Sequence, residues 1–227
     1  MLNKFKQKFF ISKKINHFIN ILLKKYLKKL NYNNFSKIAR SNKFLFVFVA
    51  LIILFLSYLL IPNVYDKDEI RKELDKQLLN KLNLNFNLSQ NLNYNFFPRP
   101  HFIIKDSIII NNQNEISNIK KIKIYVSLNN LFSLENIEVN SLVVENANFK
   151  LNKNNHDFFI KLLDENFKDI IFEIKDSNVF YKNIEKEVLF INKIINAKYY
   201  YDFKNLKNIA IMKNEIFNIP YSLELYD

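Results

Sequence analysis

The chain has 227 residues, of which 49% are hydrophobic and 25% are charged, and its formal net charge is +12. It contains no Gly and no Cys, which excludes the phosphate-binding loops and nucleophile elbows that need Gly, together with disulfides and thiolate metal sites. The three His (His17, His101, His156) lie far apart in the sequence, so we expect no metal, no cofactor and no catalytic residue.

The excess of positive charge lies in residues 1–43, which hold twelve Lys or Arg and no Asp or Glu. The rest of the chain is formally neutral, which argues against nucleic acid as a partner. Apolar residues recur at helical spacing between Ile15 and Leu30, with Lys and Asn on the other side. This pattern predicts an amphipathic helix lying on anionic lipid within a basic cytoplasmic tail. A solvated tail, or a helix that docks on a protein, is the alternative.

An uncharged apolar run extends from Phe44 to Ile61 and is followed by Pro62. At about 1.5 Å per residue its eighteen residues span roughly 27 Å, enough to cross a bilayer core. A cleaved signal peptide would have a short basic region and small residues after the apolar run, and neither is present. We therefore expect a retained transmembrane anchor at residues 44–62. The positive-inside rule then places residues 63–227 in the periplasm of a double-membraned bacterium, and the anchor in its inner membrane.

Residues 63–82 carry a second helical pattern. Asp66 or Asp68 can cap the helix, and apolar residues recur every four positions: Ile70, Leu74, Leu78 and Leu82. The stripe is narrow, so we expect a periplasmic amphipathic helix that covers another element.

From residue 83 to residue 227 the hydrophobic period changes to two. Apolar residues alternate with polar ones in several segments, among them Leu84, Phe86, Leu88 and Ile122, Ile124, Val126. Such alternation is typical of antiparallel strands with one wet face, and a short helix is expected near residues 157–167. The predicted fold class is a membrane-anchored α+β protein: one N-terminal transmembrane helix, an amphipathic helix, then a mainly antiparallel curved β-sheet. This sheet is either an open groove or a closed sandwich.

A weak repeat runs through the β-rich part. The segment FIIKDSIII at 102–110 is similar to FEIKDSNVF at 172–180, and IEVNSLVVE at 137–145 lies between them. The spacing predicts a strand pair repeated along one sheet, and chance similarity in a biased composition is the alternative. The two Lys-Asp-Ser triplets are interpreted as solvated strand ends, because neighbouring side chains on a strand point to opposite faces.

A proline-rich corner separates two of the predicted strands. It has the sequence Phe96-Phe97-Pro98-Arg99-Pro100. Pro98 and Pro100 cannot donate ladder hydrogen bonds, so they should end one strand and start the next. We expect one of the two Phe rings to be buried under the helix of residues 70–82.

In this order, the anchor, the helix, the Phe-Pro-x-Pro corner and the strands around it resemble the N-terminal region of the AsmA family. The strand Phe102–Ile110, the Leu131-Phe132 turn and the strand pair of residues 137–151 continue the resemblance, which covers about residues 44–165. Asn stands where the family has Gly. The chain stops in strand-like sequence (Tyr221, Leu223, Leu225), which leaves both a minimal member and the start of a longer chain open.

The resemblance implies a role in envelope maintenance and outer-membrane biogenesis, since AsmA proteins are bacterial inner-membrane proteins with large periplasmic parts. Longer relatives resemble bridge-like lipid-transfer proteins, in which a β-groove guides phospholipid. We expect a non-enzymatic protein whose partners are membrane phospholipids and other envelope proteins. The expected lipid-facing residues are Leu84, Phe86, Leu88, Ile122, Ile124 and Val126. The alternative is a bitopic structural or adaptor subunit of a secretion, division or lipopolysaccharide-export complex, which binds partners by an open sheet edge.

Overall fold

The structure is a computed structural model that describes residues 43–111, 114–129 and 131–226. The chain divides into two compact units, residues 1–56 and 57–227. The expected cytoplasmic tail and its expected amphipathic helix lie outside the described residues.

Helix α3 (Lys43–Leu60) and the following 3-10 turn η1 (Ile61–Asn63) form the apolar segment. Among the described residues this is the one helix long and apolar enough to cross a membrane, with a mean hydropathy of 3.1. Its position agrees with the anchor expected at residues 44–62. Leu59, in the last turn of the helix, belongs to the second unit and is buried in its core.

Helix α4 (Lys67–Leu82) follows closely. The Oδ1 atom of Asp66 accepts hydrogen bonds from the backbone N–H of Asp68 (2.9 Å) and of Glu69 (3.1 Å), which caps the first turn. The helix ends at Asn83, whose left-handed backbone (φ 50°) occupies the place that Gly often takes. The four-residue stripe of the sequence is buried along its whole length: Ile70, Leu74, Leu78 and Leu82.

The rest of the second unit is one nine-stranded sheet. Its strands are β1 (Asn85–Asn87), β2 (Leu92–Asn95), β3 (His101–Asn111), β4 (Asn114–Val126), β5 (Val139–Leu151), β6 (Ile171–Lys182), β7 (Val188–Asp202), β8 (Lys207–Ile216) and β9 (Ile219–Tyr226). The order is β1-β3-β4-β5-β6-β7-β8-β9, with β2 also beside β3. The sheet is mostly antiparallel, as expected. It is unclosed, so the described residues form no sandwich.

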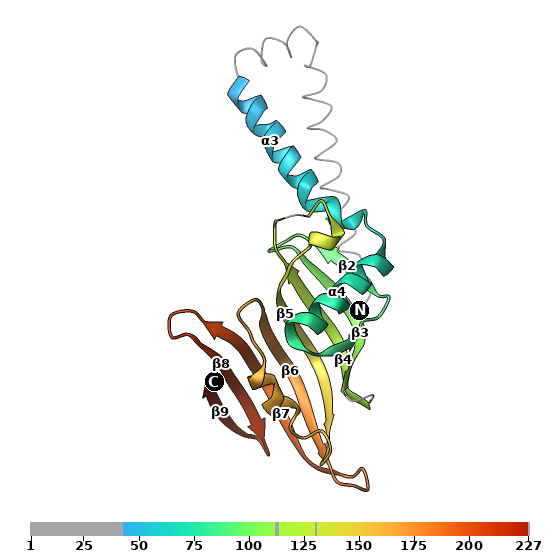
Figure 1. Cartoon of the computed structure of the whole chain (residues 1–227), viewed down its shortest axis with the longest axis vertical. Coiled ribbons are helices and arrows are strands. Elements are labelled where there is room, and N and C mark those ends of the chain that lie inside the picture. Colours follow the sequence, from blue (N-terminus) through green and yellow to red (C-terminus); the bar gives the residue numbers. More distant parts are fainter. Residues whose placement is uncertain (1–42, 112–113, 130, 227) are drawn as a thin grey trace, which may run out of the picture. The chain divides into compact units, whose positions relative to one another are not determined.

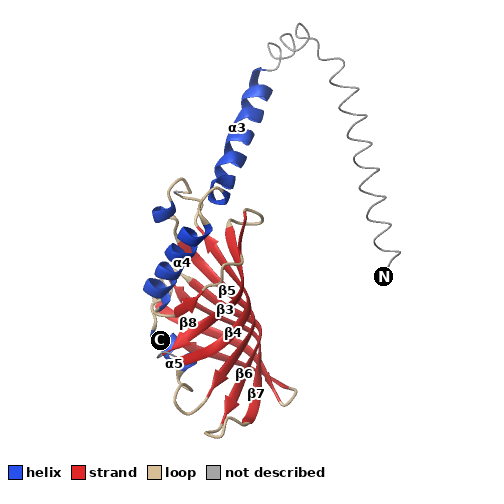
Figure 2. Cartoon of the chain, turned by 90° about the vertical axis from the view of Figure 1, so that its right-hand side faces the viewer, coloured by secondary structure: helices blue, strands red, loops and turns tan. Residues whose placement is uncertain are grey.

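One strand pair departs from the antiparallel expectation, because β5 and β6 run parallel. A parallel pair needs a crossover connection, and here residues 152–170 supply it. The crossover contains α5 (Phe158–Lys161) and η3 (Leu162–Asp164), which correspond to the short helix expected near residues 157–167. Helices α4 and α5 lie on the same side of the sheet (Figures 1 and 2), which we call the helix side. The hydrophobic core lies between them and the sheet.

Three left-handed residues lie at one level across the strands. They are Asp106 (φ 57°) on β3, Asn146 (φ 56°) on β5 and Asp176 (φ 47°) on β6. The β3–β4 ladder pairs at Lys105 and again at Ser107, and the β5–β6 ladder at Glu145 and again at Asn148. The left-handed residues therefore fall in gaps of the ladder. Asp and Asn reach positive φ more readily than other residues except Gly, which this chain lacks.

These gaps change the alternation of the strands. Ile104 and Ile109 are an odd number of positions apart, yet both side chains lie in the core. Asp106, which lies between two paired segments of the ladder, shifts the alternation of side chains by one position. In the second triplet the Ser177 hydroxyl accepts from the Ala147 backbone N–H (3.0 Å) and donates to the Lys175 carbonyl (2.7 Å). The Ser residues of both triplets, Ser107 and Ser177, are buried in the middle of their strands.

Three interpretations of the sequence are corrected by this arrangement. The Lys-Asp-Ser triplets are mid-strand irregularities and not strand ends. The segment of β5 at the same level is Glu145-Asn146-Ala147, so the segment 137–145 reaches the level of the two triplets only at its last residue. The alternation of Leu84, Phe86 and Leu88 predicts one strand, but the ladder is shorter there, because the chain leaves it after Asn87 and resumes at Leu92.

Candidate functional site

The six residues expected to face lipid lie on the helix side of the sheet, but they are covered. Leu84 is half-buried, and the other five are buried in the hydrophobic core: Phe86, Leu88, Ile122, Ile124 and Val126. Phe86 lies on β1, and Ile122, Ile124 and Val126 lie on β4, whereas Leu84 and Leu88 flank β1 outside its ladder. The buried residues among them belong to the same core cluster as the apolar stripe of α4, and Leu84 packs against that cluster.

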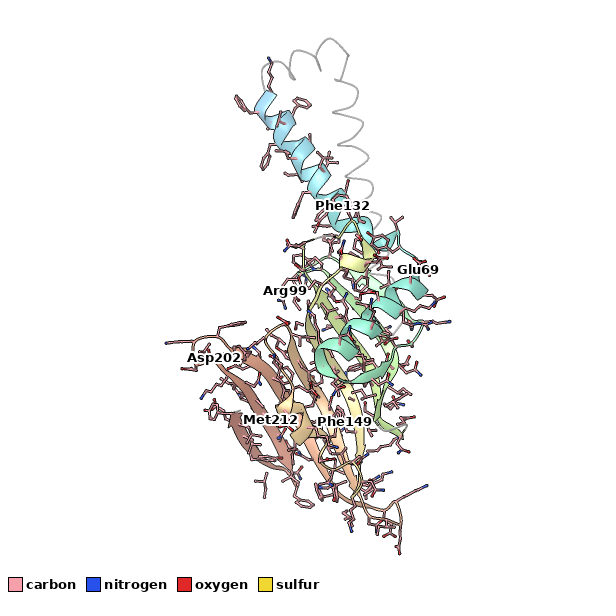
Figure 3. All side chains as sticks on the ribbon, in the orientation of Figure 1. Glu69, Arg99, Phe132, Phe149, Asp202 and Met212 are labelled. Atoms are coloured by element: carbon pink, nitrogen blue, oxygen red, sulfur yellow. The ribbon has the colours of Figure 1, made fainter. Side chains whose placement is uncertain are left out.

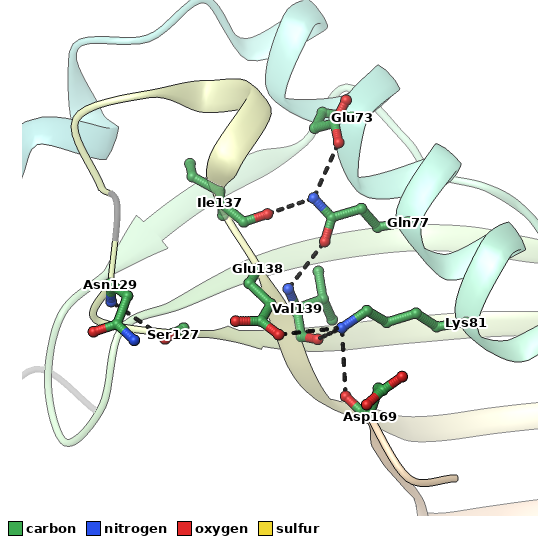
Figure 4. Close-up of polar contacts among 9 residues, drawn as sticks. All are labelled: Glu73, Gln77, Lys81, Ser127, Asn129, Ile137, Glu138, Val139 and Asp169. Carbon is green, nitrogen blue, oxygen red and sulfur yellow. Dashed lines mark hydrogen bonds and ion pairs between the residues drawn. The ribbon is translucent and has the colours of Figure 1, made fainter. Parts of the chain in front are cut away.

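Polar contacts hold α4 onto the beginning of β5 (Figure 4). The Gln77 side-chain amide donates to the Ile137 carbonyl and accepts from the Val139 N–H (3.0 Å). One turn further on, the Lys81 ammonium donates to the Val139 carbonyl (2.7 Å) and lies 3.8 Å from the Glu138 carboxylate. The polar side chains of α4 thus satisfy backbone groups at the beginning of β5, while the apolar stripe of the helix is buried. This half of the helix side is therefore a closed core.

The β5–β6 crossover covers the middle of the same face. The Phe158 and Phe159 rings lie 5.9 Å and 5.2 Å from the Phe149 ring of β5. Further along, the Phe167 ring stacks on Tyr199 of β7 at 5.6 Å. Burial raises the pKa of the Tyr199 hydroxyl well above its usual range, and that hydroxyl has no hydrogen-bond partner.

Among the described residues, the helix side stays open beyond the crossover. The strand pairing carries this face from β6 to β9. Tyr181 pairs with Phe190, Asn192 pairs with Ile216, and Met212 pairs with Leu223. Several of these side chains are well exposed, for instance Ile219 at 64% and Leu223 at 41%. We call this surface the C-terminal apolar strip. Its members are Tyr181, Phe190, Met212, Ile216, Ile219, Tyr221, Leu223 and Leu225.

Two polar side chains adjoin the strip. Asn214 pairs with Tyr221 of β9 and is only 4% exposed, and Asn192 pairs with Ile216. The Oδ1 atom of each is buried without a hydrogen-bond partner. A buried unpaired acceptor is costly, so these two amide oxygens are an unfavourable feature of this end of the sheet.

The opposite face of the sheet carries charged pairs on β4, β5 and β6. The Glu145 carboxylate lies 2.9 Å from the Lys121 ammonium and 2.5 Å from that of Lys123. Burial raises the pKa of Glu145, but the hydrogen bonds from both Lys outweigh it and hold the pKa below its usual range. On β6, Lys175 lies 2.7 Å from Glu173. On these three strands the two faces therefore differ in chemistry, as the alternation predicts.

The proline corner only partly follows expectation. It lies between β2, which ends at Asn95, and β3, which begins at His101, so the prolines stand where predicted. The expected burial of a Phe ring under α4 is wrong, because Phe97 is 77% exposed and Phe96 is also exposed. The ring that fills this end of the core is Tyr94, whose hydroxyl donates to the Leu59 carbonyl (2.9 Å).

The sequence matches the AsmA family over residues 39–188. The chain belongs to the AsmA family. A comparison with curated proteins finds no match. Membership suggests an envelope or lipid-transport function, and together with the single apolar helix it fits a membrane-anchored protein.

In this AsmA-family chain the match ends at Val188, the first residue of β7. Most of the C-terminal apolar strip therefore lies beyond the matched segment. The sequence did contain a signal for it, since Tyr221, Leu223 and Leu225 alternate with Ser222 and Glu224. What alternation cannot report is whether another element covers the apolar face.

Proposed function

We propose that this AsmA-family protein is anchored in the bacterial inner membrane by α3 and binds phospholipid acyl chains on the C-terminal apolar strip. In this role it serves envelope maintenance and outer-membrane biogenesis without catalysing a reaction. Residues 1–43 are cytoplasmic and the β-sheet is periplasmic, because the basic excess precedes the apolar run.

The observation that carries the proposal is an apolar surface that continues from the core and is left uncovered. Met212 and Leu225 pack against the core, whereas Leu223 and Ile219 further along the same face are exposed. Monomeric proteins rarely expose contiguous apolar patches of large size, and such patches mark binding sites. The strip is therefore interpreted as a surface that a ligand covers.

Acyl chains fit this surface better than a compact polar ligand does. β9 has 8 residues and is about 26 Å long at the usual rise of a strand. A hydrocarbon chain needs a continuous dry stripe and few placed polar groups.

Site-specific photo-crosslinking in intact cells tests the lipid. A photoreactive residue at Leu223 should capture phospholipid, and the matched one at Glu224, the next position on β9, should not. A third probe at Ile124 should stay silent, because α4 covers that position. Capture at both Leu223 and Glu224, or at neither, would contradict lipid binding on the strip.

The adaptor alternative rests on a different part of the same strand. Within the described residues β9 has β8 as its one neighbour, so its other edge is free to add a strand from a partner. Pro220 removes one donor near the beginning of that edge. A photoreactive residue at Leu223 or Glu224 that captures a protein and no lipid would favour this role.

Topology is tested by reporter fusions that are active only in the periplasm. A fusion after residue 80 should be active, and a fusion near residue 35 should be silent. The reverse result would overturn the compartment and, with it, the proposed access to periplasmic lipid.

A further inference from the structure

Exposed apolar side chains gather at one end of the second unit, around the last turn of α3. They belong to three short segments: the stretch after Pro62, the proline corner and the loop after β4. The members are Val64, Phe96, Phe97, Leu128 and Phe132, all exposed, and we call them the apolar rim. None of them belongs to the C-terminal apolar strip or to the core.

Tyrosine side chains hold the rim to the apolar run. The Tyr58 hydroxyl donates to the Leu128 carbonyl (2.5 Å) and accepts from the Leu131 N–H (3.1 Å). The Tyr65 hydroxyl donates to the Leu131 carbonyl (2.7 Å). All four residues belong to the second unit, so the loop after β4 is attached to the end of the apolar run whatever direction the rest of α3 takes.

The depth of the rim follows from Tyr58. This residue precedes the end of the apolar run at Ile61 by three positions, or about 4.5 Å of helix. The Phe132 ring centroid lies 4.9 Å from the Tyr58 ring centroid, and Figure 3 shows Phe132 beside the last turn of α3. Phe132 is therefore level with a residue inside the apolar run. If the run spans a bilayer, Phe132 must lie at its boundary.

The chemistry of the rim suits that boundary. Phe132 is 74% exposed, which is unfavourable in water but favourable where headgroups meet acyl chains. Neither the corner at residues 96–101 nor the loop at residues 127–133 contains Asp or Glu. Arg99, which stacks over the Tyr125 ring at 4.5 Å, adds a cation at this end. Anionic headgroups therefore meet no negative charge on these two segments, whereas Val64 of the third is followed by Asp66 and Asp68.

We propose that the apolar rim inserts into the interface of the bilayer that α3 crosses, so that the β-sheet touches this membrane at a second place besides its anchor. The inference rests on the anchoring part of the proposed function. The consequence is a fixed angle between the sheet and the membrane, because a helix alone leaves the domain free to swing.

The chain has no Trp, so single Trp substitutions report local depth in the full-length protein. Phe132→Trp and Phe97→Trp test the rim, and Phe55→Trp tests the anchor. Ile184→Trp is the matched control, because Ile184 is 88% exposed and lies in the turn after β6, at the opposite end of the sheet. Each variant is placed in nanodiscs of phosphatidylethanolamine and phosphatidylglycerol that carry bromine either high on the acyl chain or at its end.

We expect strong quenching of the two rim reporters by the shallow bromine, quenching of Phe55→Trp by the deep bromine, and none of Ile184→Trp. A quenched anchor reporter with unquenched rim reporters would overturn the rim contact and leave the anchor intact. An unquenched anchor reporter would overturn both. Quenching of Ile184→Trp equal to that of the rim would show contact without a defined surface and would also overturn the inference.

Discussion

The two halves of the helix side have the same apolar alternation but opposite surroundings. In the first half the helix-side apolar side chains of β3, β4 and β5 lie in the core with those of α4 and are buried from solvent. In the second half the strands β7, β8 and β9 continue the same face, and among the described residues Leu223 and Ile219 remain exposed on it. Alternation therefore specifies which face is apolar, while function depends on which part of that face is left uncovered.

Truncating one apolar side chain in each half gives the largest expected contrast. Leu78→Ala removes a fully buried side chain of α4 and should lower the free energy of unfolding by about 3 kcal/mol. Leu223→Ala on the strip should cost less than about 1 kcal/mol, since its side chain is partly in solvent already. Urea unfolding of the full-length protein in mild detergent measures both. Equal losses would show that the strip is covered in solution.

A smaller effect is expected from the row of left-handed residues, which the two halves share. Asp106 lies in the covered half and Asp176 at the border of the open one, and each has positive φ. Replacement by Ala should cost about 1–2 kcal/mol at either position, because a Cβ-bearing residue without a local polar side chain resists this conformation.

The matched controls are Asp106→Asn and Asp176→Asn, which keep the tolerance for positive φ and should be nearly neutral. Urea unfolding again measures the free energy. If Ala and Asn behave alike at Asp176, the irregularity there does not depend on the left-handed residue.

The covered half alone should show a pH effect, through Asp75 on α4. Burial raises the pKa of this carboxyl from 3.8 to about 6, against the lowering by Arg71 and by a backbone hydrogen bond from Leu88. An acid with a raised pKa in the folded state stabilises the fold at low pH. That contribution is lost as pH rises from the unfolded value through the folded one.

Asp75→Asn should therefore raise the free energy of unfolding by about 1 kcal/mol near neutral pH, a value reduced for solvent screening. It should have almost no effect well below the unfolded pKa. The difference between wild type and variant as a function of pH is the measurement. A difference that does not change between these limits would place the Asp75 carboxylate in contact with solvent.

The sequence by itself determined the elements of this protein and the chemistry of their surfaces. The uncharged run from Phe44 to Ile61 specifies an apolar helix, and Asp66 with the stripe from Ile70 to Leu82 specifies the next one. Both signals are local, because capping and periodicity involve residues within a few turns of each other. The order of these elements was also enough to indicate the AsmA family, which the match over residues 39–188 confirms.

Only the tertiary structure decided what lies against what. The period of Phe86, Ile122 and Ile124 is the same whether a helix or a lipid covers them, so their burial under α4 could not be read from it. The exposure of Phe97 and the parallel pairing of β5 with β6 likewise depend on contacts between residues distant in sequence. These contacts are settled by competition among apolar surfaces for the same partner. In this chain α4 covers one half of the sheet and leaves the other half open.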